Sequence, residues 1–164
     1  MTEQLDLRAG FDVCAVDLSG EAVAQVRSLA HTHAPRLPAE NFRREPVERM
    51  SFEDESFGAV LSSAVLHFAR DEGHWHKMLG EMWRVLRPGG VFFARLASSD
   101  GVEDYVEHLG GRRFRQRGGA EWLLADEAMM REATGKLRGE LLEPLKTVVV
   151  HGERAMAVWC LRKP

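Results

Sequence analysis

The sequence has few of the features that mark membrane, secreted or disulfide-rich proteins. Its two cysteines, Cys14 and Cys160, lie far apart inside apolar runs, so neither a zinc site nor a disulfide framework is indicated. Buried thiols in a reducing compartment are the simpler interpretation. No apolar run approaches the roughly 20 residues of a transmembrane helix, and residues 1–8 lack the apolar segment of a secretory signal. We therefore expect a cytoplasmic protein with no membrane partner.

An excess of charge of one sign is also lacking. The chain has 22 Lys and Arg against 25 Asp and Glu, a formal net charge of -3. Its dense cationic cluster is residues 112–117, where four arginines are interspersed with Phe and Gln. This pattern favours a solvated hairpin over a phosphate-binding track, and we expect no nucleic-acid partner. The pairs His31/His33 and His74/His76 are two residues apart and would not face each other on a helix, so no metal site is predicted.

What the first 96 residues do contain is an alternation of strand and helix patterns. Nearly continuous apolar runs are typical of strands buried on both faces of a parallel sheet. Ser19 is predicted to cap a first helix, and residues 72–86 carry the Met and Trp stripe of a second, which stops at Arg-Pro-Gly-Gly. Strands are predicted at 11–17, 41–45, 57–63 and 91–96.

The second part of the chain predicts a hairpin, a helix and an antiparallel tail. Residues 114–124 resemble a small hairpin around Gly118-Gly119, and Asp126 caps a helix that ends at Gly139. The runs 145–150 and 155–161 are joined by a link so short that the strands must be antiparallel. We expect one α/β domain over residues 1–164, with a Rossmann-like, mostly parallel sheet and an antiparallel C-terminal hairpin.

Asp17, at the carboxyl end of the first predicted strand, is the first functional candidate. Ligands of open α/β sheets bind outside the carboxyl ends of the strands, where an acid can accept both hydroxyls of a ribose. A helix-capping or solvated aspartate is the alternative interpretation.

Four segments then carry a resemblance to a known family. Residues 11–19 end in Asp-Leu-Ser, and residues 50–57 read Met-Ser-Phe-Glu-Asp-Glu-Ser-Phe. A predicted strand then ends at Ser63 and is followed by a hydrophobic segment with His67. Residues 81–90 read Glu-Met-Trp-Arg-Val-Leu-Arg-Pro-Gly-Gly. In this order they resemble the class I S-adenosylmethionine-dependent methyltransferases, in particular the small-molecule group. The antiparallel tail is similar to the reversed last strand of that family.

The resemblance implies S-adenosylmethionine as cofactor and a set of residues that hold it. Asp17 corresponds to the ribose-binding acid, and Ser63 follows the family's fourth strand at the site. The implied cofactor-binding residues are Asp17, Leu18, Ser19, Val47 and Ser63.

Two departures from the family pattern stand out. The family's first strand and glycine loop belong upstream of Leu7, where only six residues stand, and residues 4–9 are interpreted as the end of a helix. The domain is therefore expected to be N-terminally truncated relative to the family: a fragment or mis-started gene, a sheet that closes its own gap, or a homodimer in which a second copy completes the site. At Pro46 the family often has an acid that contacts adenine, though Val47 can still offer its N–H.

The resemblance also implies an acceptor site that needs little acid–base chemistry, because the sulfonium is already a good leaving group. His67 is the one catalytic candidate, as a proton acceptor; the alternative is a histidine that packs the start of a helix. Acceptor-binding residues are expected within 98–124, and the candidates are Tyr105, Arg113 and Trp122.

The leading hypothesis is methyl transfer to a small-molecule acceptor. A second hypothesis is a non-catalytic remnant or fragment that acts, if at all, as a binding domain. A third, a nicotinamide-dependent oxidoreductase, is opposed by the Leu-Arg-Pro-Gly-Gly stretch at 86–90 and the reversed tail.

Overall fold

The computed structural model describes residues 10–151 and 153–164. They fall into two compact units, a smaller one up to Ser51 and a larger one from Phe52. The single domain predicted over residues 1–164 stays a prediction, and the helix end predicted at residues 4–9 lies outside the described residues. No helix of the described part of the chain is long and apolar enough to cross a bilayer.

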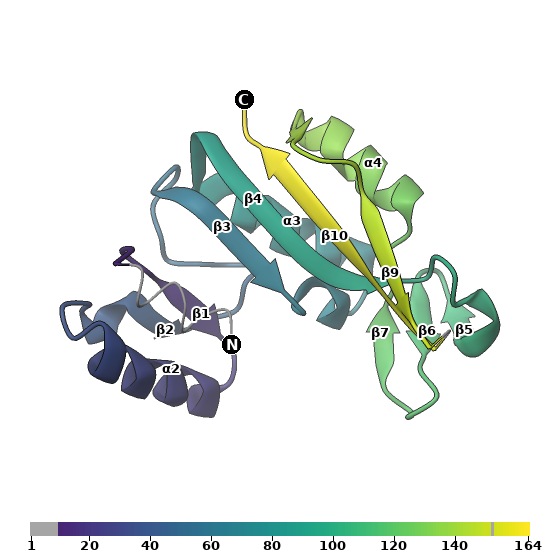
Figure 1. Cartoon of the computed structure of the whole chain (residues 1–164), viewed down its shortest axis with the longest axis horizontal. Coiled ribbons are helices and arrows are strands. Elements are labelled where there is room, and N and C mark those ends of the chain that lie inside the picture. Colours follow the sequence, from purple (N-terminus) through teal and green to yellow (C-terminus); the bar gives the residue numbers. More distant parts are fainter. Residues whose placement is uncertain (1–9, 152) are drawn as a thin grey trace. The chain divides into compact units, whose positions relative to one another are not determined.

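The smaller unit is a pair of parallel strands with one helix packed along it (Figure 1). Ser19 caps the helix as predicted, because its side chain accepts a hydrogen bond from the N–H of Ala22 at 3.2 Å. The strand predicted at 11–17 is reduced to its last three residues, because its partner is also only three residues long. The elements are β1 (Ala15–Asp17), α2 (Gly20–His33), η1 (Ala39–Asn41) and β2 (Phe42–Arg44).

The larger unit is built on a mixed sheet. The strands are β3 (Phe57–Ser63), β4 (Leu86–Ser98), β8 (Glu140–Leu141), β9 (Lys146–Val150) and β10 (Arg154–Arg162). β3 and β4 are parallel, whereas β10 runs antiparallel to β4 on one edge and to β8 and β9 on the other. The predicted Rossmann-like α/β fold with a reversed C-terminal hairpin is confirmed, with parallel pairing limited among the described strands to β1–β2 and β3–β4.

β4 begins earlier than predicted. The Arg-Pro-Gly-Gly stretch, expected to be a turn before residue 91, lies inside the strand at a register shift opposite Phe57 and Ala59. A Cβ on Gly90 would lie 2.8 Å from the carbonyl oxygen of Arg87 and 3.0 Å from that of Gly58. Only glycine fits this close approach of two backbones, so the stretch shapes the start of the strand.

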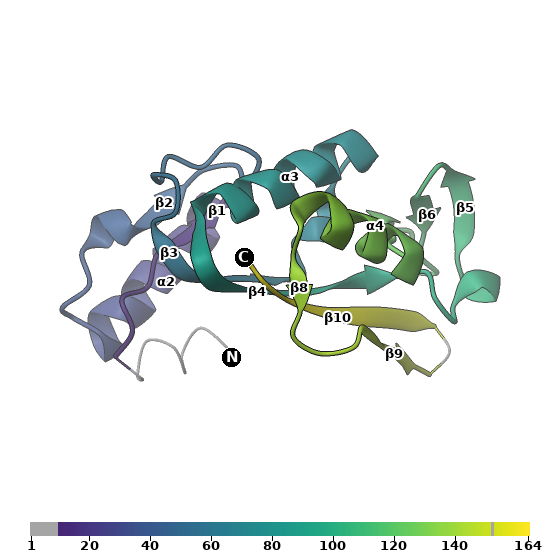
Figure 2. The ribbon, with the colours of Figure 1, turned by 90° about the horizontal axis from the view of Figure 1, so that it is seen from above.

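Two helices, α3 (Glu72–Val85) and α4 (Glu127–Leu137), cover one face of this sheet (Figure 2). Trp159 of β10 joins both, since its ring stacks on Trp75 of α3 and its Nε1 donates to Thr134 Oγ1 of α4 at 3.0 Å. The opposite face is only partly exposed. Leu61 is 56% exposed there, whereas Ala97 and Met156 are buried in a cluster with Leu124.

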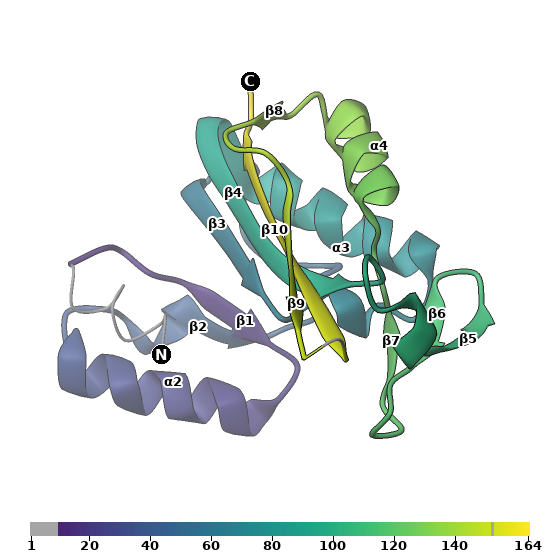
Figure 3. The same cartoon turned by 45° about the vertical axis from the view of Figure 1, so that its right-hand side comes forward.

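A small antiparallel sheet precedes α4 (Figure 3). The hairpin predicted around Gly118-Gly119 is confirmed, and the four arginines of 112–117 each pair with a carboxylate, as expected of a solvated hairpin. Asp126 caps α4 as predicted. The helix ends at its C-cap, Arg138, which has a left-handed backbone, rather than at Gly139. Gly139 has no side chain and so leaves room for Leu161 and Trp83. The strands are β5 (Glu107–Gly110), β6 (Arg113–Arg115) and β7 (Glu121–Leu123).

β1 and β3 each have an edge that pairs with no described strand. Among the described strands, β1 pairs only with β2, and β3 pairs only with β4. No described strand therefore takes the place of the family's first strand, next to either of them.

Candidate functional site

Asp17 ends β1 and begins a tight turn into α2. One carboxylate oxygen, Oδ1, accepts a hydrogen bond from the N–H of Ser19 at 2.6 Å, and Ser19 in turn caps the helix. The side chain is exposed, and its second oxygen has no partner among the described residues. The turn thus holds an acid in a fixed position at the carboxyl end of a parallel strand, the location at which α/β sheets bind ligands.

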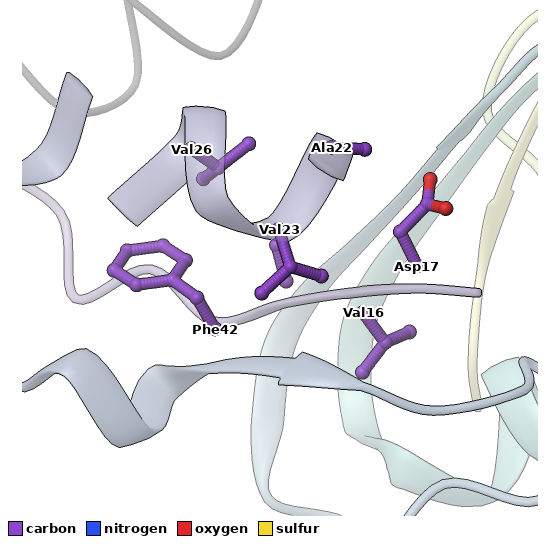
Figure 4. Close-up of a pocket in the computed structure, with 7 residues that line it drawn as sticks. Val16, Asp17, Ala22, Val23, Val26 and Phe42 are labelled. Carbon is purple, nitrogen blue, oxygen red and sulfur yellow. The ribbon is translucent and has the colours of Figure 1, made fainter. Parts of the chain in front are cut away.

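A cavity of about 90 Å³ lies beside this turn, with Asp17 at one end and Phe42 at the other (Figure 4). Val23 and Val26 of α2 line it, so its wall is mainly apolar. The volume is below the roughly 300 Å³ at which small-molecule pockets begin. The cavity by itself therefore does not hold a nucleoside, and a ligand of Asp17 would lie outside the strand end.

Two neighbours of this turn offer complementary contacts for a nucleoside. Leu18 is 65% exposed, so its apolar side chain can cover the face of a base. Val47 is half-buried, and its N–H has no hydrogen-bond partner among the described residues. Pro46, which replaces the acid common in the family, offers a carbonyl that accepts from the N–H of Arg49 at 3.1 Å.

Ser63 ends β3 in the larger unit. It is exposed and lies opposite Arg95 of β4 in the sheet register. The next residue, Ala64, has a left-handed backbone (φ 59°) held by its N–H bond to the carbonyl of Arg95 at 2.8 Å. Such a conformation is costly for a residue other than glycine and is often found at functional sites.

His67 is only 3% exposed and belongs to η2 (Leu66–Phe68). Its Nδ1 accepts a hydrogen bond from the N–H of Ala97 at 3.3 Å, and its ring packs against Trp122 with 4.8 Å between centroids. Burial, helped by the charges of Arg95 and Arg154, lowers the pKa of His67 to about 4. The ring is therefore uncharged near pH 7 and is a weak base.

The three predicted acceptor-binding residues are only partly brought together. Trp122 of β7 contacts His67, and Arg113 of β6 donates to the carbonyl of Ala69 at 3.3 Å, so both lie next to η2. Tyr105 is exposed, and its ring lies under the guanidinium of Arg117 at 5.6 Å. No contact joins it to Trp122 or Arg113 in the described part of the chain.

Sequence reasoning missed two residues near His67. Phe68 is 60% exposed and packs against His67 at 4.6 Å between centroids. Arg95 is the only charged residue of the apolar run 91–96. Because arginine is rarely buried without a partner, its position in this run indicates a side chain that faces solvent.

The cysteines are half-buried rather than buried as predicted: Cys14 lies just before β1, and Cys160 lies in β10 on the face of the sheet opposite to Trp159. Burial raises the pKa of both thiols. They are protonated near pH 7 and are poor nucleophiles.

A parallel strand that ends in a fixed acid, followed by a capped helix, defines a Rossmann-like protein of the type that binds nucleotide-containing cofactors. The family described as "Methyltransferase domain" matches residues 1–94 of the 164. The chain belongs to this family, and its resemblance to the class I S-adenosylmethionine-dependent methyltransferases is confirmed.

A curated relative and two solved structures illustrate the similarity. A phthiotriol/phenolphthiotriol dimycocerosates methyltransferase of Mycobacterium tuberculosis is 37% identical over 82 residues, which are 49% of this chain and 29% of that protein. A SAM-dependent methyltransferase of Methanosarcina mazei has a TM-score of 0.73 and 20% identity, covering 99% of this chain and 86% of the other. The 1,6-didemethyltoxoflavin-N1-methyltransferase of Burkholderia thailandensis, solved with S-adenosylhomocysteine, has a TM-score of 0.68 and 22% identity, covering 94% and 62%.

The similarity to these two solved structures shows the fold of this chain. The segment aligned with the curated relative spans less than a third of that protein's length.

Proposed function

We propose that this chain carries out S-adenosylmethionine-dependent methyl transfer to a small-molecule acceptor. The observation that carries the proposal is the exposed carboxylate of Asp17, fixed by the N–H of Ser19 at the carboxyl end of β1. Its free oxygen can accept a hydrogen bond from a ribose hydroxyl, and each such charge-assisted bond contributes on the order of 1.5–3 kcal/mol. The phthiotriol/phenolphthiotriol dimycocerosates and 1,6-didemethyltoxoflavin methyltransferases, to which the chain is similar, support a small-molecule acceptor.

The other cofactor contacts follow from the same turn. We assign Leu18 to the face of the adenine and the N–H of Val47 to its edge, with Ser19 fixing Asp17 rather than touching the cofactor. In the larger unit Ser63, at the end of β3, is assigned to the amino-acid part of the cofactor or to the acceptor. These assignments fit the chemistry of the residues present: a carboxylate for hydroxyls, an apolar side chain for a ring and an N–H for a ring nitrogen.

When bound, S-adenosylmethionine supplies a methyl group on a sulfonium, whose sulfur keeps the bonding electron pair as the acceptor's lone pair forms the new bond. The chain's task is then to align the acceptor and exclude water. With a pKa of about 4, His67 is poorly suited to take the acceptor's proton near pH 7. We propose that His67 instead positions Trp122 and Phe68, the two rings that it contacts.

A binding domain without catalysis is the second candidate. The unpaired edges of β1 and β3 favour it, because no described strand adds to either edge and the described residues contain no glycine loop. For the enzyme, a homodimer in which a second copy completes the site is one of the alternatives for the missing first strand. It predicts that sedimentation in the presence of the cofactor shows a dimer.

Calorimetry with S-adenosylhomocysteine tests the cofactor site. We expect micromolar binding by the wild type and a loss of at least about tenfold in Asp17→Asn, which keeps the shape but removes the charge. Asp12→Asn, an exposed aspartate of the same unit, is the matched control and should bind like the wild type. No heat of binding in the wild type, or equal losses in both variants, would refute the cofactor site.

Transfer of a labelled methyl group from S-adenosylmethionine to a panel of small molecules separates the two candidates. Binding with turnover supports the enzyme. Binding without turnover of any acceptor supports the binding domain.

A further inference from the structure

Two arginines lie on the face of the larger unit's sheet that is opposite to α3 and α4. Side chains alternate between the faces of a strand, so residues paired directly across β3, β4 and β10 share a face. Arg95 pairs with Ser63 of β3 and with Val158 of β10, and Arg154 lies four residues before Val158 on β10. Ala97 and Met156, which pair with each other between the two arginines, are buried and pack with Trp122. Since Trp159 and Ala157 face the helices, Arg95, Met156 and Arg154 face the other way.

Both guanidinium groups lack a partner among residues 10–151 and 153–164. Arg95 and Arg154 are exposed, and neither makes an ion pair or side-chain hydrogen bond within the described residues. This sets them apart from the arginines at 112–117, which all hold carboxylates. Nearby acids are engaged elsewhere, since Glu153 pairs with Arg117 at 2.7 Å. Two cations on one face with no counter-charge form a surface that favours an anion.

Aromatic rings adjoin the two arginines. His67, tied to the N–H of Ala97 on β4, contacts Phe68 and Trp122, whose rings lie 6.3 Å apart and perpendicular to each other. Phe68 is 60% exposed although it is a large apolar side chain. Arg95 and Arg154 both depress the pKa of His67, so both guanidinium groups act on the same buried ring from β4 and β10.

We propose that Arg95, Arg154, Phe68 and Trp122 form a binding site for an aromatic carboxylate. The guanidinium groups would hold the carboxylate, a geometry that arginine matches with two parallel N–H bonds. The exposed ring of Phe68 and the half-buried ring of Trp122 would pack against the aromatic part. The role of this ligand as the methyl acceptor rests on the proposed function. The binding of the ligand to this site does not depend on the proposed function.

The test uses 2-naphthoate and its uncharged analogue 2-naphthamide, titrated into the full chain without cofactor and followed by NMR. We expect 2-naphthoate to bind at least tenfold more tightly than 2-naphthamide, and the double variant Arg95→Gln/Arg154→Gln to lose that preference. Phe68→Ala should weaken both ligands. Arg162→Gln is the matched control, an exposed unpaired arginine on the same strand and face as Arg154 but at the opposite end, and should leave binding unchanged.

Equal affinity for the two ligands, or equal losses in Arg162→Gln and in the double variant, would overturn the site. The outcome is separable from that of the proposed function. Binding of 2-naphthoate by a chain that ignores S-adenosylhomocysteine supports the aromatic-carboxylate site and removes its role as an acceptor site. Binding of S-adenosylhomocysteine with no response to 2-naphthoate removes the site and leaves the methyltransferase proposal standing.

Discussion

The two units place their candidate residues on cores of different size. In the smaller unit, Phe42 is the one aromatic side chain of a core cluster of small and medium apolar residues, built on strands of three residues. In the larger unit Trp75, Trp159 and Phe92 are fully buried between a sheet and two helices. A pair of short strands is marginally stable without further packing. The turn at Asp17 thus depends on a weak scaffold, and a ligand that binds it should stabilise that unit.

The largest expected effect comes from removing the central side chain of each core. Trp159→Ala and Phe42→Ala should each cost about 3–5 kcal/mol, because both leave large cavities. Hydrogen exchange should show lost protection in β4 and β10 for Trp159→Ala and in α2 for Phe42→Ala. In the wild type, α2 should exchange faster than β4. Slower exchange in α2 than in β4 would contradict the difference in core size.

The next largest effect is a dependence of stability on pH, which we expect in the larger unit only. The pKa of His67 is about 4 in the folded state against an ordinary 6.5, so between these values the unfolded chain holds the extra proton. Stability should therefore fall as the pH falls from 6.5 to 4, by up to about 3 kcal/mol. Urea unfolding at pH 7 and pH 4.5 measures this. His67→Gln should flatten the profile, whereas His31→Gln, an exposed histidine of the smaller unit, should leave it unchanged.

Helix caps give a smaller, matched comparison. The carboxylate of Asp126 accepts from the N–H of Met129 at 2.7 Å and from Arg112 at 2.6 Å. The hydroxyl of Ser19 accepts, among the described residues, only from the N–H of Ala22 at 3.2 Å. Asp126→Ala should cost about 1–2 kcal/mol and Ser19→Ala about 0.5–1 kcal/mol. Thermal unfolding of both variants checks the order. A larger loss for Ser19→Ala would mean that the cofactor turn contributes more to stability than its contacts indicate.

The smallest expected effect is a gain in the stability of the larger unit. Gly80 lies on the exposed side of α3, and a Cβ there would meet nothing within 4 Å. Gly80→Ala should stabilise the larger unit by about 0.5–1 kcal/mol, because alanine loses less backbone entropy in a helix. Urea unfolding with an unchanged midpoint or a loss would argue that the helix is held differently from the structure described here.

Sequence alone predicted the elements well where hydrophobic periodicity was strong. β3 was placed to the residue at 57–63, and the caps Ser19 and Asp126 were both identified from their residue types. Local patterns did not predict features that depend on distant partners. The strand character of residues 86–90 arises from the backbone of Gly58 across the sheet, and the role of Gly139 arises from Trp83 and Leu161.

The candidate site was predictable to a similar degree. Asp17 and its turn follow from a strand that ends in an acid before a capping serine. The contact between His67 and Trp122 joins positions 55 residues apart, and the placement of Arg95 and Arg154 on one face depends on the register of β4 and β10. Such juxtapositions are set by sheet pairing, which a single sequence does not reveal.

The central claim is that the turn after β1 holds the adenosine of a cofactor. A titration of ¹⁵N-labelled protein with S-adenosylhomocysteine tests it residue by residue. Our account predicts saturable shifts of the amide signals of Leu18, Ser19 and Val47, with that of Arg162 unmoved. Signals of the first three that stay in place while others shift, or no response at millimolar ligand, would contradict it.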